Sequence, residues 1–265
     1  NVKFCQGVAN GTDALEIAIK ALELKKNSEI LVPANTWISS AEAILNNNLN
    51  VKFVDVDETH NVSISDLRKK LTKKTSALIL VHLYGNPANL NEILKLKKKY
   101  KFKIIEDCAQ AHGAEFEKKK VSTFGEIGTF SFFPSKNLGC FGDGGCVVTN
   151  NKKLYLKMKK ISNHGGLKKN SHLVLGRNSR LDNLQAGILR IKLRNLDRWI
   201  SLRNKQAELY YKYLEGTKEI SFVKKLKNTK SSFHLMVIKT QYRDKLKHYL
   251  NRKGIQTGIH YPKSL

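Results

Sequence analysis

The sequence predicts an α/β protein built on a mainly parallel β-sheet, followed by a smaller α/β piece. In the first part of the chain, short apolar runs alternate with amphipathic segments, as strands do when helices connect them. Several of these apolar runs are continuous rather than alternating, which is typical of strands buried on both faces. From about Arg180 onward, the pattern changes to a long helical region.

The first helix is expected near the N-terminus, where five apolar residues between Ala14 and Leu22 fall on one helical face. The strands are predicted at Glu29–Val32, Val51–Val56, Ala77–Leu83, Phe102–Glu106, Gly128–Phe133 and Cys146–Thr149. Helices are expected between many of them, for example at Ala41–Asn46 and Leu90–Tyr100.

The second part of the chain starts with a helical region that is predicted to run to about Tyr213. A loop near Lys224–Ser232, an apolar run at Phe233–Ile238 and a short helix at Arg243–Arg252 follow. We therefore expect a large domain at residues 1–195 and a partial small domain at residues 196–265. The chain opens without Met and stops abruptly, so we expect both ends to be cut from a longer protein.

The composition is that of an ordinary globular protein. Of 265 residues, 41% are hydrophobic, 26% charged and 8% aromatic, which excludes collagen-like, low-complexity and largely disordered chains. No apolar stretch approaches the roughly 20 residues that a membrane helix needs. The 4 cysteines form no CxxC pair and no histidine cluster accompanies them, so we expect no metal site and a reducing, cytoplasmic setting.

The net charge of +26 would attract polyanions such as nucleic acid or phosphorylated ligands. The lysines are scattered along the chain, however, and no basic-aromatic stripe or zinc-finger spacing accompanies them. We therefore expect a lysine-rich surface rather than a nucleic-acid-binding groove. A non-catalytic basic protein that binds nucleic acid remains the alternative from another functional class.

Two segments have residues suited to holding a phosphorylated aromatic cofactor. Gly11 and Thr12 open the first helix, where free backbone amides and the helix dipole favour an anion; a plain helix cap is the alternative. Asp107 follows a buried strand, at the sheet edge where ligands of parallel sheets bind. An acid there can hold a positively charged ring nitrogen, although Asp at a strand end is more often solvated or a cap.

Two further segments complete the set. Lys136 lies in a loop between an apolar strand and the glycines at 142–145. Partial burial would lower its pKa and make it a competent Schiff-base nucleophile, unless it is one more surface lysine. The fourth segment, Gly176–Asp182, also reads as a loop that caps the next helix.

Taken together and in this order, these segments resemble the DegT/DnrJ/EryC1/StrS family of sugar aminotransferases. The resemblance covers nearly the whole chain and is most specific at 106–110, 131–137 and 142–145. It implies the fold of the pyridoxal-phosphate-dependent transferases, with helices on both faces of the sheet. It also implies pyridoxal 5′-phosphate as cofactor.

The resemblance also implies residue roles. Lys136 would form the Schiff base and move the proton, Asp107 would pair with the ring nitrogen, and Gln110 would contact the ring or its phenolic oxygen. The remaining cofactor contacts would come from Trp37 stacked on the ring, from Gly11, Thr12 and Ser131 at the phosphate, and from Asn178, which would reach the phosphate of the neighbouring subunit in a homodimer.

The family's usual substrates are a nucleotide-linked keto-sugar and glutamate as amino donor, in amino-sugar biosynthesis. The segment 178–182 and the ending at 260–262 look more like the 3-keto branch than the 4-keto branch. Candidate substrate-side groups are His164, Arg180, His234 and His260, each with a structural alternative. A sugar dehydratase of the same fold is the nearer rival, but that branch carries histidine in place of the Schiff-base lysine.

Overall fold

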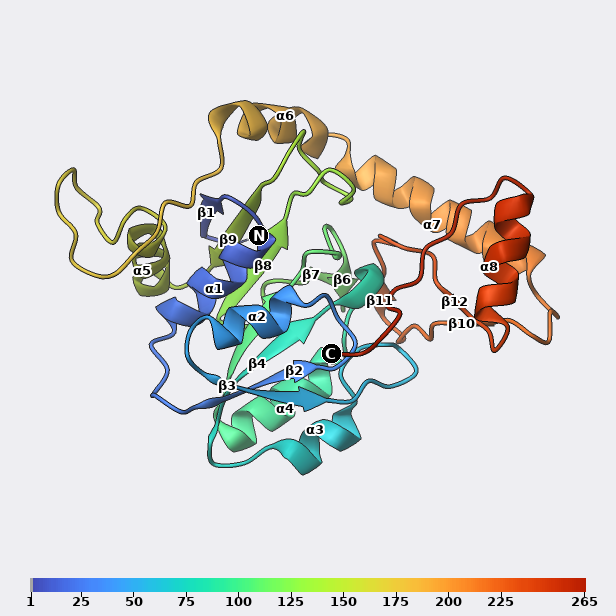
Figure 1. Cartoon of the computed structure of the whole chain (residues 1–265), viewed down its shortest axis with the longest axis horizontal. Coiled ribbons are helices and arrows are strands. Elements are labelled where there is room, and N and C mark those ends of the chain that lie inside the picture. The colour runs from blue at the N-terminus through green and yellow to red at the C-terminus, as the bar shows by residue number, and fades with distance from the viewer. Residues whose placement is uncertain (1) are drawn as a thin grey trace.

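The structure, a computed structural model, describes residues 2–265 and is organised around a seven-stranded sheet (Figure 1). The strand order is β1-β9-β8-β5-β4-β2-β3. The strands are β1 (Phe4–Val8), β2 (Glu29–Pro33), β3 (Asn50–Val54), β4 (Thr75–Val81), β5 (Lys103–Asp107), β8 (Ile127–Ser131) and β9 (Gly145–Thr149). Strands β3, β2, β4, β5 and β8 run parallel, whereas β9 is antiparallel to both β8 and β1. The expectation of a mainly parallel sheet is confirmed.

Helices cover both faces of this sheet because its strands are apolar on both sides. In β2, Ile30 and Val32 pack in one core with α1 (Gly11–Ala21), α2 (Ser39–Leu45) and α5 (Lys152–Ile161). Leu31, between them, joins the core on the other face with α3 (Ile64–Lys70) and α4 (Leu90–Tyr100). This alternation follows from the period of two in a strand, and it explains why the apolar runs in the sequence are continuous.

Each of the six predicted strands corresponds to a strand of the structure, and the predicted bounds differ from the observed ones by a few residues at the ends. The run Ala77–Leu83 was expected to be one strand, but β4 ends at Val81 and Leu83 begins a short 3₁₀ turn at Leu83–Gly85. The run Gly128–Phe133 ends as a strand at Ser131, where the chain turns toward Lys136. Strand β1 was not predicted, because only its antiparallel pairing with β9 makes this short segment a strand.

The predicted long helical region is two helices, α6 (Asn183–Leu193) and α7 (Leu196–Tyr213). The break falls at Arg194 and Asn195, and Asn195 is one of the residue types that favour caps over helix interiors. The apolar run Phe233–Ile238 is mostly irregular. Only Ile238 joins a strand, β12 (Ile238–Lys239), which pairs with β10 (Ser221–Phe222), and Phe233 has a positive φ of 41° that a strand cannot accommodate.

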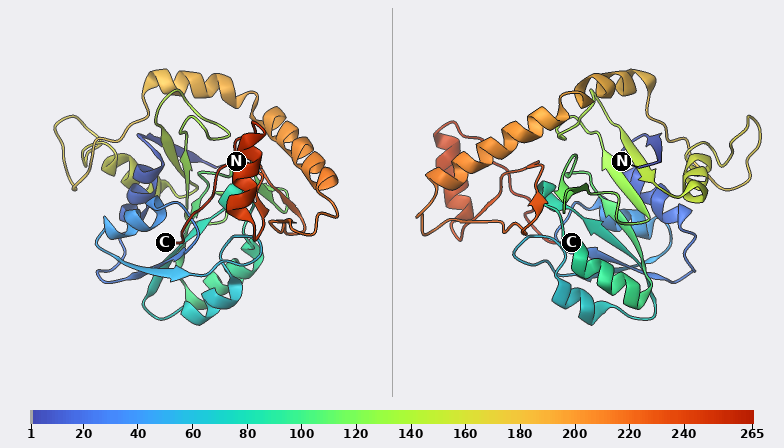
Figure 2. Two further views of the ribbon diagram at one scale, coloured as in Figure 1. Left: turned by 45° about the vertical axis from the view of Figure 1, so that its right-hand side comes forward. Right: turned by 180° about the vertical axis from the view of Figure 1, so that it is seen from behind.

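The C-terminal elements lie to one side of the sheet. Helix α8 (Arg243–Arg252), at its predicted bounds, lies beside α7 in every view (Figures 1 and 2). A small sheet joins this part to the body, because β11 (Thr229–Lys230) pairs with β6 (Glu115–Phe116), which pairs with β7 (Lys119–Lys120). Within the described residues 2–265, no helix has the length and apolar character to cross a membrane.

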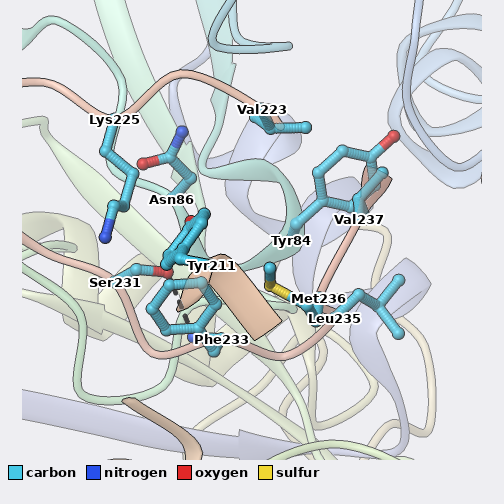
Figure 3. Close-up of a pocket in the computed structure, with 10 residues that line it drawn as sticks. All are labelled: Tyr84, Asn86, Tyr211, Val223, Lys225, Ser231, Phe233, Leu235, Met236 and Val237. Atoms are coloured by element: carbon cyan, nitrogen blue, oxygen red, sulfur yellow. Dashed lines mark hydrogen bonds between the residues drawn. The ribbon is translucent and has the colours of Figure 1, made fainter. Parts of the chain in front are cut away.

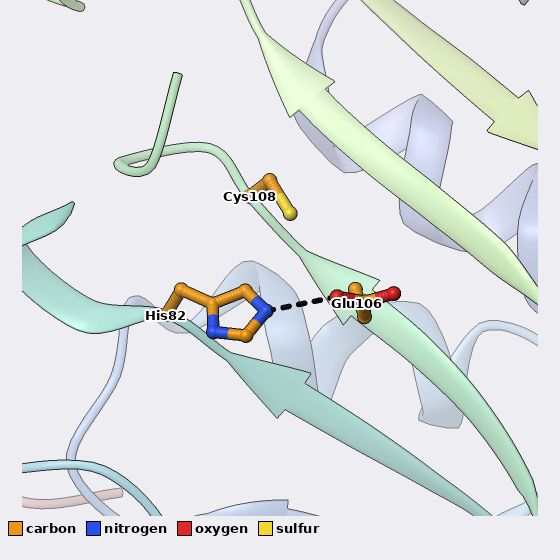
Figure 4. Close-up of side chains that lie close together, drawn as sticks. All are labelled: His82, Glu106 and Cys108. Atoms are coloured by element: carbon orange, nitrogen blue, oxygen red, sulfur yellow. Dashed lines mark hydrogen bonds and ion pairs between the residues drawn. The ribbon is translucent and has the colours of Figure 1, made fainter. Parts of the chain in front are cut away.

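A buried carboxylate at the end of β5 fixes the path of the chain between β5 and β8. Glu106 is fully buried and accepts hydrogen bonds from the amides of Ser122, Phe124 and Gly125 at 2.6–2.8 Å. His82, at the end of β4, adds a fourth contact from its Nε2 at 3.1 Å (Figure 4). Burial alone would raise the pKa of Glu106, but these hydrogen bonds together hold it below its usual value.

The same network also includes Cys108, which lies beside His82 and Glu106 (Figure 4). Three such side chains together could in principle ligate a metal. His82, however, accepts the amide of Ala88 on its Nδ1 and faces Glu106 with its Nε2, and burial raises the pKa of the Cys108 thiol well above its usual value. The ligand atoms are thus committed to protein hydrogen bonds or protonated, and the cluster is a structural network.

Replacing Glu106 with Gln is expected to destabilise the protein by about 1–3 kcal/mol at neutral pH, because an amide cannot accept hydrogen bonds with both of its terminal atoms. A carboxylate whose pKa is lowered by folding stabilises above its unfolded pKa of about 4.3, and this contribution disappears as the pH falls through the lower, folded value. The difference between the two proteins in urea unfolding should therefore shrink in acid.

The matched control is Glu58→Gln, since Glu58 is an exposed residue paired with Lys224. This change is expected to leave the urea midpoint nearly unchanged at neutral pH. An E106Q protein as stable as the parent at pH 7 would contradict the role given to the buried carboxylate.

Candidate functional site

A cavity of about 390 Å³ lies at the edge of the sheet where the central strands end. Strands β2, β5 and β8 end at this edge because they run parallel, and β1 ends there too because two antiparallel steps through β9 align it with β8. The ends of these four strands and the segments that follow them bring Thr12, Trp37, Asp107 and Lys136 to the walls of one cavity. This edge is where ligands of parallel sheets bind.

One end of the cavity is the N-terminus of α1. Asn10 caps the helix with its side chain on the amide of Asp13 (2.8 Å), and its carbonyl accepts the amide of Ala14 (3.1 Å). The amides of Gly11 and Thr12 occupy the first positions of the helix, where no intrahelical acceptor exists. These two amides, together with the helix dipole, form a site suited to an anion.

Gly11 is required by the close approach of β8. A Cβ atom on Gly11 would lie 2.7 Å from Cβ of Ser131, which is too close for any side chain. The hydroxyl groups of Ser131, Thr12 and Ser39 line the cavity at this end, and those of Thr12 and Ser39 lie 2.7 Å apart. The predicted phosphate-binding residues are therefore brought together around the helix N-terminus.

Asp107 provides a buried carboxylate at the floor of the cavity. Its two oxygens accept hydrogen bonds from the Ser40 hydroxyl (3.2 Å) and from the Ala109 amide (3.0 Å). Burial raises the pKa of Asp107, and the nearby Lys136 opposes that shift without overcoming it. Such a carboxylate gains most from a cationic partner placed in the cavity.

Lys136 lies in a loop that closes on itself. Its amide donates to the Phe133 carbonyl (2.9 Å), and the amide of Cys140 donates to the Phe132 carbonyl (2.8 Å). Burial lowers the pKa of the Lys136 amine, while the Asp107 carboxylate partly opposes this. A larger share of the amine is therefore neutral and nucleophilic at neutral pH than at an exposed lysine.

Helix α6 fastens the glycine-rich turn that follows Lys136. The Phe141 amide donates to Oε1 of Gln185 (2.8 Å), and Nζ of Lys192 donates to the Gly139 carbonyl (2.6 Å). Nζ of Lys192 also lies 4.8 Å from the centre of the Phe141 ring. Gln185 and Lys192 are seven residues apart and therefore share one face of the helix.

Gln110 and Trp37 also line the cavity. The Gln110 side chain accepts the Tyr84 amide (2.7 Å) and donates to the Tyr261 hydroxyl (3.0 Å), so its orientation is fixed before any ligand binds. The Trp37 ring is 61% exposed, and its centre lies 6.0 Å from that of Tyr261. Gln110 and Trp37 thus lie beside the cavity, as expected for residues that would contact a ring.

The four predicted substrate-side residues divide into two pairs. His234 and His260 line the cavity, and burial together with the charge of Lys136 lowers the pKa of His234 to about 3. His164 and Arg180 do not line it. Asn178 lies outside this cavity as well, on the loop between α5 and α6, and its side chain is exposed.

Several cavity residues were not among the predicted site residues. Ser40 bonds to Asp107, Asp143 adds a second carboxylate, and Tyr261 bonds to Gln110. Ser40 and Asp143 could have been found, since both follow predicted site segments closely in sequence. Tyr261 reaches the cavity from the far end of the chain, and no local pattern marks that contact.

A second, much smaller cavity lies between Tyr84 of the sheet domain and the segment 231–237 (Figure 3). Its volume is about 20 Å³, the size of one water molecule. Oδ1 of Asn86 faces it and accepts no hydrogen bond among the described residues. This cavity cannot hold a cofactor and is part of the packing between the two segments.

The cavity of about 390 Å³ thus combines an anion site, an amine of lowered pKa and a buried carboxylate. These three features suit a ligand that carries an anionic group, a group that an amine can attack and a positive charge.

Comparisons with known proteins agree with this chemistry. A sequence model of the DegT/DnrJ/EryC1/StrS aminotransferase family matches residues 1–265. A UDP-N-acetyl-3-dehydro-alpha-D-glucosamine 3-aminotransferase of Acidithiobacillus ferrooxidans is 42% identical over 97% of this chain and 69% of its own. A dTDP-3-amino-3,4,6-trideoxy-alpha-D-glucose transaminase of Streptomyces venezuelae is 38% identical over 97% of this chain and 68% of its own.

Solved structures are similar over the whole chain. The structure of S. venezuelae DesV in complex with a ketimine intermediate has a TM-score of 0.97 and 37% identity, covering 100% of this chain and 71% of that one. The structure of NtdA from Bacillus subtilis with bound cofactor PMP has a TM-score of 0.91 and 29% identity, covering 99% and 61%. The resemblance and the fold class drawn from the sequence are confirmed.

Replacing Asp107 with Asn is expected to lower the pKa of Lys136 further, because the carboxylate charge is what opposes the effect of burial. The pH dependence of Lys136 acetylation by acetic anhydride, followed by peptide mass mapping of cofactor-free protein, should shift to lower pH. Asp143→Asn removes a carboxylate from the same cavity and serves as the matched control, with no shift expected. Equal profiles for D107N and the parent would show that the two groups do not interact.

Proposed function

The chain belongs to the DegT/DnrJ/EryC1/StrS aminotransferase family, and on this premise we propose that it transfers an amino group to a nucleotide-linked keto-sugar with pyridoxal 5′-phosphate as cofactor. The observation that supports this most is the shared cavity of Lys136 and Asp107, which ends at the N-terminus of α1. The names of the relatives, which are sugar-nucleotide aminotransferases, support the same activity.

The residues of the cavity fit pyridoxal phosphate. The amides of Gly11 and Thr12, with the Ser131 hydroxyl, would hold its phosphate, and the Gly11–Ser131 approach leaves this end without side-chain bulk. Asp107 would hold the ring nitrogen, Trp37 would cover the ring face, and Gln110 would contact its phenolic oxygen or ring edge. When bound, the cofactor supplies an electron-withdrawing ring that stabilises negative charge on the substrate carbon and carries the amino group between half-reactions.

Lys136 holds the position from which a proton can be moved. Burial favours the neutral form of its amine, which is the form that would bond to the cofactor. The same amine would then serve as the general base and acid for the substrate proton. Proton transfer by a positioned group contributes roughly 10²–10⁴-fold to rate. The closed 132–140 loop limits how far Lys136 can move away.

Asp107 contributes charge rather than proton transfer. Its carboxylate is oriented by hydrogen bonds from Ser40 and Ala109, so it would hold an N–H⁺ group of the ring in place. The raised pKa of Asp107 reflects the cost of burying this carboxylate without a cation. A cationic partner removes that cost, and binding is correspondingly stronger.

Glutamate is proposed as amino donor and the 3-keto sugar as acceptor. The two relatives described above carry names that refer to 3-amino or 3-dehydro sugars. His234 and His260 are the cavity groups placed to contact a sugar hydroxyl or the keto oxygen. The overall positive charge of the chain suits an anionic sugar nucleotide.

A homodimer is proposed as the active unit. Apart from the histidines, Lys136 is the sole basic side chain among the described residues that line the cavity, although the substrates are anionic. Asn178, exposed on the loop between α5 and α6, would reach the phosphate of a second subunit, and Arg180 lies two residues further on. We also propose residues 1–195 as the cofactor-binding domain and residues 196–265 as part of a smaller one.

Lys136→Ala is expected to abolish turnover while leaving the urea unfolding midpoint within experimental error. In the parent protein, borohydride added after pyridoxal phosphate should place a reduced adduct on Lys136, found by peptide mass mapping. Turnover that survives in the variant, or an adduct confined to other lysines, would overturn the role of Lys136. The appearance of 2-oxoglutarate from glutamate separates transamination from sugar dehydration.

The position of amination is tested with paired nucleotide sugars that carry the keto group at C3 or at C4. We expect amino-sugar product from the 3-keto compound, with at least a tenfold higher kcat/KM, since a misplaced carbonyl loses its near-attack geometry. Product from the 4-keto compound alone would refute the assignment of branch while leaving the aminotransferase reaction intact.

A further inference from the structure

The segment that carries Asn178 is extended, with alternate side chains on opposite sides. Ser179 is fully buried, and its hydroxyl accepts the Ala9 amide at 3.0 Å. Leu181 packs closely against β1, since a Cβ atom added to Gly7 would lie 2.8 Å from the Cβ atom of Leu181. Asn178 and Arg180, which alternate with these residues, are both exposed. The outward side of the segment is therefore the side that a second subunit can contact.

Arg177 is the third residue on the inward side of the segment, and its side chain extends to α1. Its Nη1 donates to Oδ1 of Asp13 at 2.8 Å, and its Nη2 donates to Oε2 of Glu16. Both carboxylates lie on the first turns of α1, the helix whose N-terminus forms the anion site. Glu16 is almost fully buried, and Asn46 holds its other oxygen at 2.7 Å.

The backbone on either side of Asn178 is paired as well. The amide of Arg177 donates to the Ile161 carbonyl (2.8 Å), and that of Ser179 donates to the Ser162 carbonyl (3.0 Å). Asn178 itself faces Asn163 in an antiparallel bridge. Beyond this pairing, the loop between α5 and α6 extends away from the sheet (Figures 1 and 2).

We propose that Arg177 is a positioning residue: its bridge to Asp13 and Glu16 locks the segment onto α1 so that Asn178 faces outward at the height of a neighbouring subunit's phosphate site. This proposal rests on the proposed homodimer and on the reach of Asn178. It goes further by assigning a role to a residue that does not line the site cavity.

The geometry explains why an arginine is suited here. Its planar guanidinium presents donors on two separate nitrogens and binds two carboxylates one helical turn apart, whereas a lysine has all its donors on one nitrogen. The bridge also offsets one of the two negative charges that Asp13 and Glu16 place within two turns of the anion site, where they would weaken phosphate binding. In each subunit, α1 would thus have two roles. Its N-terminus would bind the phosphate of that subunit, and its bridge to Arg177 would orient Asn178 toward the phosphate of the other subunit.

The test measures the affinity for pyridoxamine 5′-phosphate by calorimetry. This probe binds without forming a bond to Lys136. Four proteins are compared: the parent, Arg177→Met, Asn178→Ala and the double variant. Asn178→Ala should weaken binding about tenfold, the loss of one charge-assisted hydrogen bond. R177M should weaken it to a similar extent, and the double variant should be no weaker than the weaker single variant, because both changes remove the same contact.

Two further variants separate positioning from folding. Arg177→Lys keeps the charge but replaces the two donor nitrogens by one, so its affinity should lie between those of the parent and R177M. Arg252→Met makes the same chemical change in the exposed last turn of α8 and should bind like the parent. Sedimentation velocity of every variant checks that the dimer persists.

Each outcome decides between the two proposals. If N178A binds weakly but R177M binds like the parent, the role of Arg177 is wrong and the reach of Asn178 stands. If the effects multiply in the double variant, or if R177M becomes monomeric, Arg177 acts independently of Asn178 and the inference falls. If N178A binds like the parent, the reach of Asn178 in the proposed function is wrong, and the positioning role falls with it.

Discussion

The buried Glu106 carboxylate is the interaction on which the geometry of the site depends. It accepts hydrogen bonds from three amides of the 122–125 loop and contacts the His82 ring. These contacts connect the ends of β4 and β5 to the segment that leads into β8. Asp107 is the next residue and must point to the opposite face of the strand. A fixed Glu106 therefore fixes the direction of Asp107, and the sheet edge is ordered before any ligand is present.

The site uses polar groups in two distinct ways. Around Glu106, both carboxylate oxygens and both ring nitrogens of His82 have hydrogen-bond partners within the protein, which makes the network rigid. Asp107 and Lys136 differ from this network. Burial raises the pKa of Asp107 and lowers that of Lys136, so it favours the neutral form of each group, and the charge of the other group opposes this only in part. Because the Glu106 network is rigid, a ligand that pairs with Asp107 and Lys136 can bind without a rearrangement of the surrounding backbone.

The sequence allowed the fold class to be predicted, together with most of the residues that line the cavity, for reasons visible in individual residues. Continuous apolar runs such as Ile104–Ile105 indicate a strand buried on both faces, and Asp107, Ser131 and Gly11 lie next to the elements that position them. The missed features depend on contacts between distant parts of the chain. Strand β1 exists through its pairing with β9, and Tyr261 meets Gln110 across 151 positions. The division of the C-terminal helical region also escaped prediction, because Asn195 is compatible with both a helix interior and a break.

Helix α6 has a mechanical consequence for the lysine loop. In the described part of the chain Leu189 is its one buried residue, yet Gln185 and Lys192 tie it to the turn immediately after Lys136. Leu189 itself lies in the apolar cluster that also contains Leu138 and Cys140 of that loop. The positions of α6 and of the loop that carries Lys136 are therefore coupled, and a change in one has to be accommodated by the other.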